Sequence, residues 1–119
     1  MKNYFRSHEF DSPDNPGSGA NMHPTFLRML NHARAIAGIP FRINSGFRTP
    51  EHNAKVGGSD TSSHLRGYAA DIHATSSTYR YEILSALLQA GFTRIGIAET
   101  FIHVDNDPIK TQKVIWTYA

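Results

Sequence analysis

The sequence predicts an α+β fold, in which helices pack on a small, mostly antiparallel sheet. Two stretches, residues 24–37 and 76–91, carry apolar residues at helical spacing. Short strand-like runs occupy much of the remainder, and three of them follow one another in the last 28 residues, 92–119. This order of elements favours the α+β class. We expect residues 1–119 to form a single domain, because a chain of this length can bury one core but not two.

The first half of the chain predicts a helix followed by a strand. A short helical turn is expected at Tyr4 to Phe10, and residues 11–22 are rich in turn-forming residues and predict an irregular loop. Pro24 suits the first turn of a helix, which Gly38 then ends. Residues 41–45 alternate apolar and polar side chains, which indicates a strand.

The remaining elements follow from caps, turns and apolar runs. Thr49-Pro50-Glu51 is typical of the start of a short helix, which would end at Gly57-Gly58, and residues 68–74 predict a central strand. Ser76 is a plausible cap for the second long helix. Further strands are expected at three places, residues 92–98, 100–104 and 113–118.

Composition excludes several classes of function. The chain has no cysteine, so a bound metal would need His, Asp or Glu ligands, and it has seven histidines. The net charge is only +2 and the arginines are dispersed, which argues against a nucleic-acid-binding domain. No run is long and apolar enough to insert into a membrane, and the N-terminus does not resemble a signal peptide. We therefore expect a protein that is cytoplasmic as synthesised.

Three residues stand out as possible metal ligands. His64 and Asp71 lie seven residues apart at the boundary between a loop and a strand, and His103 lies in a second strand-like run. Two imidazoles and one carboxylate suit zinc and leave one coordination position open, which favours a zinc hydrolase. A single histidine is more often an ordinary surface or hydrogen-bonded residue, and a buried aspartate often serves a turn or cap.

An ordered set of motifs resembles a known family. The motifs are Ser45-Gly46-Phe47-Arg48-Thr49-Pro50-Glu51-His52-Asn53, Gly57-Gly58, Ser63-His64-Leu65-Arg66-Gly67-Tyr68-Ala69-Ala70-Asp71-Ile72 and His103-Val104-Asp105. Together they resemble the zinc D-alanyl-D-alanine carboxypeptidases, a group with VanY-like and VanX-like members, phage L-alanyl-D-glutamate endopeptidases and the structurally related Hedgehog domain. The resemblance implies a Hedgehog/DD-peptidase-like fold, and the chain length is similar to that of compact phage members.

The resemblance also implies roles for individual residues. His64, Asp71 and His103 match the zinc ligands of the family. Arg48 matches an arginine near the substrate carboxylate or carbonyl, where a planar two-pronged donor is suitable, although a salt bridge within the loop would also explain it. Ser63 matches a serine beside the first ligand, which could bind substrate or order the loop.

The general base is less well defined by the sequence. Family members place a Glu, Asp or His a few residues before the last ligand, often as Glu-x-x-His, whereas here Glu99 precedes His103 by four residues. In a regular strand that even spacing would put both side chains on one face, so Glu99 is the first candidate. Asp105 shares the same face and is the competing candidate, either as base or as a group that orients a ligand histidine. His73, two residues after Asp71, is interpreted as a partly buried polar residue.

The implied activity is that of a zinc metallopeptidase acting on peptidoglycan stem peptides. It would cleave D-Ala-D-Ala as a carboxypeptidase or L-Ala-D-Glu as an endopeptidase, and a phage endolysin-type enzyme would reach the cell wall when the host lyses. We expect a monomer that binds neither nucleic acid nor membrane. The alternative is a non-catalytic, zinc-containing binding or structural module of the same fold.

Overall fold

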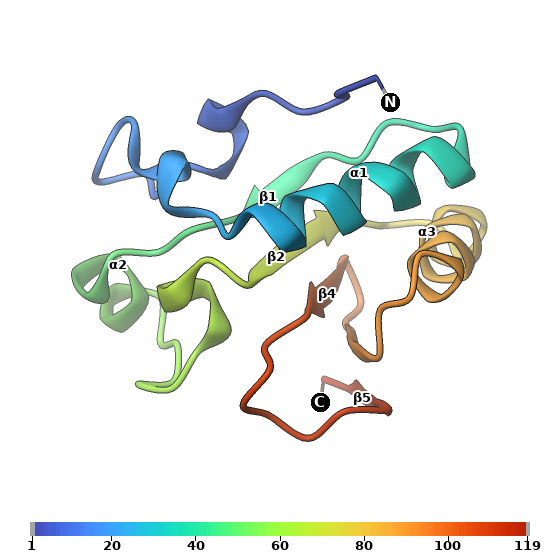
Figure 1. Ribbon diagram of the computed structural model, residues 1–119. Coiled ribbons are helices and arrows are strands. Elements are labelled where there is room, and N and C mark those ends of the chain that lie inside the picture. Colours follow the sequence, from blue (N-terminus) through green and yellow to red (C-terminus); the bar gives the residue numbers. More distant parts are fainter. Residues whose placement is uncertain (1, 119) are drawn as a thin grey trace.

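The computed structural model describes residues 2–118, in which a sheet carries its two long helices on one face (Figure 1). The helices are α1 (Pro24–Ala37), α2 (Pro50–Lys55) and α3 (Ser77–Gln89), and the strands are β1 (Ile43–Ser45), β2 (Ala69–His73), β3 (Arg94–Ile97), β4 (Phe101–Asp105) and β5 (Val114–Thr117). Single turns of 3-10 helix occur at Ser7–Phe10, Ser18–Asn21 and Ser63–Arg66.

The sheet is mixed but mostly antiparallel. Its strand order is β1-β2-β4-β3-β5, and every neighbouring pair is antiparallel except β3 and β5. The predicted α+β class with a mostly antiparallel sheet is therefore confirmed.

The two faces of the sheet have different chemistry because side chains alternate along each strand. Ile72 of β2 and Ile102 and Val104 of β4 are fully buried in the hydrophobic core, together with Phe26 and Leu30 of α1 and further residues of α3. The intervening residues of the same strands, Asp71 and His103 among them, lie on the opposite face. Helices α1 and α3 thus anchor the sheet and leave its other face to polar side chains.

The helix boundaries agree with the sequence signals. The His23 ring accepts a hydrogen bond from the backbone N–H of Thr25 at the start of α1, and Gly38 ends this helix with a left-handed φ of 68°. Ser76 accepts from the N–H of Tyr79 at the start of α3, as the sequence predicts. Within residues 2–118, no helix has the length and apolar character that crossing a bilayer requires.

Asp107 fixes the loop that precedes β2 to the loop that follows β4. Its side chain is fully buried and accepts hydrogen bonds from the Ser63 hydroxyl at 2.6 Å, from the Arg66 guanidinium and from the Ile109 N–H at 3.3 Å. Burial by itself would raise the pKa of Asp107, but Arg66 and Ser63 outweigh burial and hold the pKa below its usual value. Because His64 follows Ser63 directly, the ionised Asp107 also fixes the position of His64.

Replacement of Asp107 by asparagine tests this contact. An amide cannot accept all of these bonds, so Asp107→Asn should destabilise the protein by about 1–3 kcal/mol at neutral pH. The folded-state pKa is lowered, so the stabilisation is fully present above the unfolded pKa of about 3.9 and is lost as the pH falls through the folded value. Thermal unfolding from neutral pH to about pH 2.5 should show the wild-type advantage shrinking below about pH 4.

The matched control is Asp60→Asn at an exposed position. Its thermal stability should stay close to that of the wild type over the same pH range. A wild-type advantage over Asp107→Asn that stays constant through the acid range would contradict an ionised, stabilising Asp107.

Candidate metal centre

The polar face of the sheet brings together the three residues that the sequence nominates as ligands. His64 comes from the 3-10 turn Ser63–Arg66, Asp71 from β2 and His103 from β4. Asp71 and His103 are direct cross-strand partners in the register of β2 and β4. All three residues are buried, and one potential ligand atom from each lies within 4.8 Å of the others.

His64 is held in one tautomer by a backbone carbonyl. Its Nδ1 lies 2.7 Å from the carbonyl oxygen of Gly46, which can only accept, so Nδ1 carries the hydrogen. In the neutral ring Nε2 then has a free lone pair, and this atom is 3.3 Å from Asp71 Oδ1. The ring therefore presents its unprotonated nitrogen to the cluster, which is the arrangement a metal ligand needs.

His103 is oriented by two carboxylates. Its Nε2 lies 2.7 Å from Asp105 Oδ2, and its Nδ1 lies 2.9 Å from Asp71 Oδ1. Burial would lower the pKa of His103, but the hydrogen bonds to Asp105 and Asp71 outweigh it and raise the pKa above its ordinary value. If Nδ1 held a metal in place of its proton, the bond from Nε2–H to Asp105 would still fix the ring and its tautomer.

Asp105 is occupied on both of its oxygens. While Oδ2 accepts from His103, Oδ1 accepts from Arg94 Nε at 2.7 Å and from the backbone N–H of Asp107 at 3.1 Å. The residue is only 1% exposed. Burial would raise the pKa of Asp105, but His103 and these other donors lower it. This geometry suits a residue that orients His103.

Asp71 joins the two histidines to Arg48. Burial would raise the pKa of Asp71, yet the hydrogen bond with His103 and the neighbouring imidazole of His64 outweigh it and hold the pKa far below its usual range. Its Oδ2 is 3.4 Å from a terminal nitrogen of Arg48. Arg48 also donates to the hydroxyl of Ser45 at 3.0 Å and to the side-chain oxygen of Asn53 at 3.2 Å, which holds its guanidinium beside the cluster.

The donor set fits zinc. Zinc favours imidazole nitrogen and carboxylate oxygen, whereas calcium and magnesium prefer sites made of oxygen alone. The His64, Asp71 and His103 side chains supply two nitrogens and one oxygen from rigid elements, and three protein ligands leave a coordination position for a reactant.

The cluster opens into a cavity of about 400 Å³. The cavity is lined by Arg48, Val56, Gly57, Gly58, Ser59, Ser62, Ser63, His64, Asp71, Arg94, Phe101, His103, Asp105, Lys110, Trp116 and Tyr118. Ser63 is among these residues, but its hydroxyl already donates to Asp107, so toward a ligand it can only accept. The carboxylates among these residues are Asp71 and Asp105.

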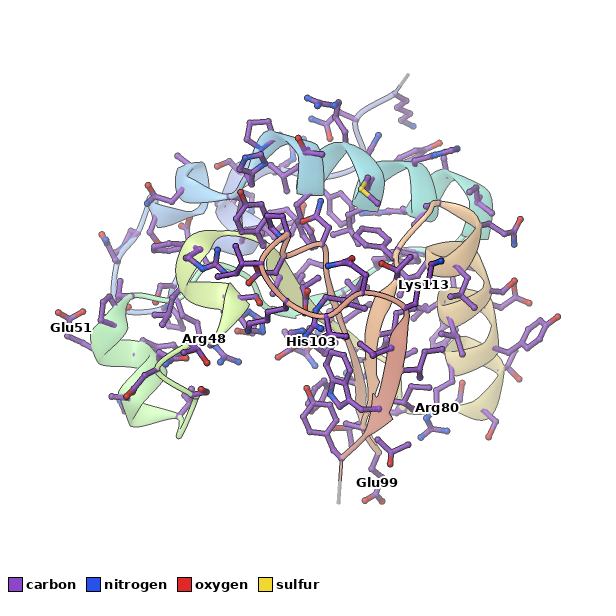
Figure 2. The ribbon with its side chains drawn as sticks, turned by 60° about the horizontal axis from the view of Figure 1, so that its bottom comes forward. Arg48, Glu51, Arg80, Glu99, His103 and Lys113 are labelled. Atoms are coloured by element: carbon purple, nitrogen blue, oxygen red, sulfur yellow. The ribbon has the colours of Figure 1, made fainter. Side chains whose placement is uncertain are left out.

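Glu99 does not take the position that a regular strand would give it. Strand β4 begins at Phe101, and Glu99 lies exposed in the turn between β3 and β4, where its carbonyl oxygen accepts from Arg80 at 2.5 Å. Figure 2 shows Glu99 at the end of the molecule away from His103. The expectation that Glu99 and His103 share one strand face was wrong, because the strand starts after Glu99.

The sequence does not identify several residues that the structure places at the cavity. The pairing of β3 with β4 brings Arg94 to the cavity, and the pairing of β5 with β3 brings Trp116 and Tyr118 there. The alternation of Trp116 and Tyr118 within a predicted strand was the available signal, because it puts both on one face. His73, at the end of β2, is half-buried and does not belong to the ligand cluster.

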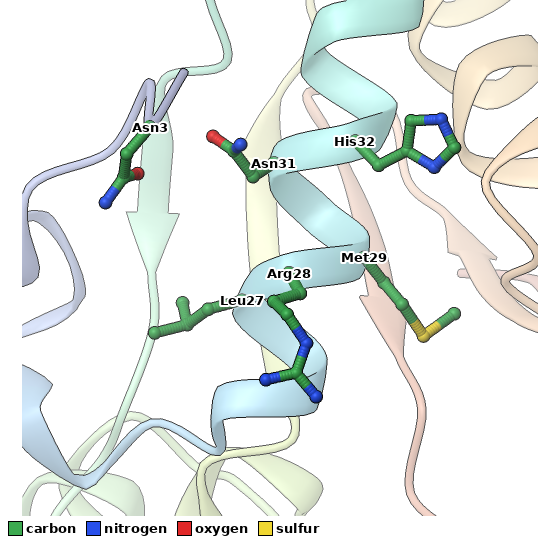
Figure 3. A pocket seen from close by; sticks show the side chains of 6 residues that line it. All are labelled: Asn3, Leu27, Arg28, Met29, Asn31 and His32. Carbon is green, nitrogen blue, oxygen red and sulfur yellow. The ribbon is translucent and has the colours of Figure 1, made fainter. Parts of the chain in front are cut away.

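A second hollow, of about 540 Å³, lies on the outer side of α1 (Figure 3). It is lined by Asn3, Leu27, Arg28, Met29, Asn31 and His32. None of these residues is acidic and His32 is the single histidine among them, so a metal centre or an acid–base pair cannot be assembled from this lining.

Comparisons with known proteins agree with the geometry. The model of the family described as Peptidase M15 matches residues 4–105. A zinc D-Ala-D-Ala carboxypeptidase of Streptomyces albus G is 34% identical over 76 residues, which are 64% of this chain. The match spans only 29% of the length of that relative. Since the family model covers most of the chain, including all three residues of the cluster, the protein belongs to the Peptidase M15 family.

Proposed function

We propose that the protein is a zinc metallopeptidase that hydrolyses peptidoglycan stem peptides, at D-Ala-D-Ala as a carboxypeptidase or at L-Ala-D-Glu as an endopeptidase. The observation that carries this proposal is the convergence of His64, Asp71 and His103 at a cavity that Arg48 also lines. Zinc held by these three residues would supply a Lewis acid for a water molecule and for the scissile carbonyl. An endolysin-like role at the cell wall is part of the same proposal.

Arg48 would bind and orient the substrate. A guanidinium has five N–H donors, and the contacts with Ser45, Asn53 and Asp71 use three of them. The remaining donors are available to a carboxylate or a carbonyl oxygen in the cavity. Since the existing contacts hold the guanidinium in place, little further conformational entropy is lost when a substrate binds.

The presence of a residue that can act as general base distinguishes the proposed peptidase from its alternative, a non-catalytic zinc-containing module of the same fold. Asp105 is engaged by His103, Arg94 and a backbone N–H, so we assign it to the orientation of His103. Glu99 does not line the cavity in this structure. The shortage of a free carboxylate is the observation that favours the non-catalytic module, and the variants below distinguish the two.

Metal content tests the ligand assignment. The purified protein should hold about one zinc ion per chain, and His64→Ala should lose most of it, since two protein ligands bind zinc far more weakly than three. The matched control is His52→Ala, which also removes an imidazole from a neighbouring element but leaves the cluster intact. The zinc content per chain is measured by elemental mass spectrometry. Equal zinc in His64→Ala and in the wild type would exclude this site.

Digestion of purified muropeptides tests the reaction. The zinc-loaded protein should shorten or split the stem peptides, and removal of zinc by a chelator should abolish the change until zinc is restored. Fragment masses distinguish loss of a terminal D-Ala from a cut between L-Ala and D-Glu. Intact muropeptides after prolonged incubation with a fully zinc-loaded protein would favour the non-catalytic module.

Substitution of the two acidic candidates tests their roles. Glu99→Gln should keep turnover within about threefold of the wild type, whereas loss of a general base costs about 10²–10⁴-fold. Asp105→Asn should weaken zinc binding by about 10–100-fold, because an amide cannot accept from His103 and from Arg94 together. Chelator competition measures the affinity and muropeptide release measures turnover. A loss of 100-fold or so in Glu99→Gln, with zinc retained, would make Glu99 the base.

A further inference from the structure

Strand β5 contributes to the cavity although it lies beyond residues 4–105, the part that matches the family. It pairs in parallel with β3, and Trp116 is the register partner of Gly96. Gly96 is in turn the partner of His103 on β4. Asp71, His103, Gly96 and Trp116 therefore form one row across four strands, on the face that carries the metal cluster.

Gly96 allows the indole of Trp116 to lie over β3. A Cβ atom at position 96 would be 2.5 Å from Trp116 Nε1 and 2.8 Å from Tyr118 Cε1, closer than any side chain permits. The indole occupies that space and reaches the His103 ring, with 5.5 Å between the ring centroids and 47° between the planes. This separation is contact distance for two rings, so little room remains between the indole and the ligand.

Other side chains keep the two aromatic rings in place. The guanidinium of Arg94 lies 5.1 Å from the centroid of the Trp116 ring, within cation–π range. The Tyr118 and Phe101 rings are 5.3 Å apart between centroids. Arg94 is itself held by a hydrogen bond to Asp105. The residue that orients His103 therefore also fixes the guanidinium that packs on the indole. Phe101, Trp116 and Tyr118 together are named the aromatic wall.

The cavity consequently has a lining of two kinds. Besides the aromatic wall, it contains Arg48 and a segment of small residues, Gly57, Gly58 and Ser59, which follows α2. Charged and polar parts of a peptide, such as a carboxylate or a carbonyl, are stabilised near Arg48. The apolar side chain of the same peptide is stabilised against aromatic carbon.

We propose that Trp116 determines substrate specificity, by restricting the residue beside the scissile bond to a small side chain such as the methyl group of alanine. The inference rests on the proposed peptidase function and adds to it a reason why alanine-containing bonds are selected. Gly96 serves this role indirectly, because any larger residue there would push the indole away from its position.

Paired synthetic peptides test the proposal. Peptides ending in D-Ala-D-Ala are compared with peptides in which either alanine is replaced by D-Leu. The zinc-loaded wild type should prefer D-Ala at one of these positions by about tenfold or more in kcat/KM, and Trp116→Ala should reduce that preference about tenfold. The matched control is Ile115→Ala, in the same strand but on the other face and 55% exposed, which should keep the wild-type preference.

Two further variants distinguish a change in the shape of the aromatic wall from a loss of folding. Tyr118→Phe keeps the ring and should keep the preference, while Gly96→Ala should lower it as Trp116→Ala does. Thermal unfolding and zinc content of every variant identify any that are misfolded, and those are set aside. A preference that is the same, within about twofold, in wild type, Trp116→Ala and Gly96→Ala overturns the proposal.

Fluorescence gives a test that does not need turnover, because Trp116 is the only tryptophan in the chain. With zinc bound, the D-Ala-D-Ala peptide should change the Trp116 emission at concentrations where the D-Leu peptides do not. If no peptide is cleaved but this difference is seen, the D-Ala-D-Ala carboxypeptidase activity fails and the role of Trp116 as a size-restricting wall is supported. If the three peptides change the emission equally, or none does, the wall proposal is overturned.

Discussion

The pairing of β2 with β4 is the constraint on which the site depends. It puts Asp71 directly beside His103, and the Asp71 carboxylate also contacts His64 and Arg48. A shift of one residue in this register would turn Asp71 toward the hydrophobic core and bring an isoleucine or alanine to the polar face. The buried Ile72, Ile102 and Val104 prevent such a shift, so the packing under α1 and α3 fixes the geometry of the cluster.

The groups around the three candidate ligands restrict how each of them is oriented. The Gly46 carbonyl selects one tautomer of His64, and Asp105 holds the outer nitrogen of His103. Arg94 links Asp105 to the indole of Trp116, so the metal cluster and the aromatic wall share one buried network. A change in β5 can therefore influence the candidate ligand His103 across the one intervening strand, β3.

The sequence predicts the parts of this arrangement that depend on local signals. Proline and glycine mark the ends of α1, and the resemblance of the ordered motifs to a zinc peptidase family nominates His64, Asp71, His103 and Arg48, which the structure brings together. Prediction from the sequence fails where the position of a residue depends on a turn or on pairing between distant strands. The position of Glu99 was mispredicted because a strand was assumed to continue through a turn. Trp116 approaches His103 only because parallel pairing of β5 with β3 brings it over Gly96, a contact between segments 20 residues apart that no local pattern specifies.

The most direct measurement of the central claim is a long-range ¹H–¹⁵N correlation spectrum of the histidine rings, recorded before and after zinc is added. The structure predicts that zinc binds His64 through Nε2 and His103 through Nδ1, because Gly46 and Asp105 occupy the other nitrogens. The Nε2–H of His103 should remain protonated in the zinc-loaded protein. Ligation of His103 through Nε2, or histidine signals at positions 64 and 103 that do not respond to zinc, would contradict the account.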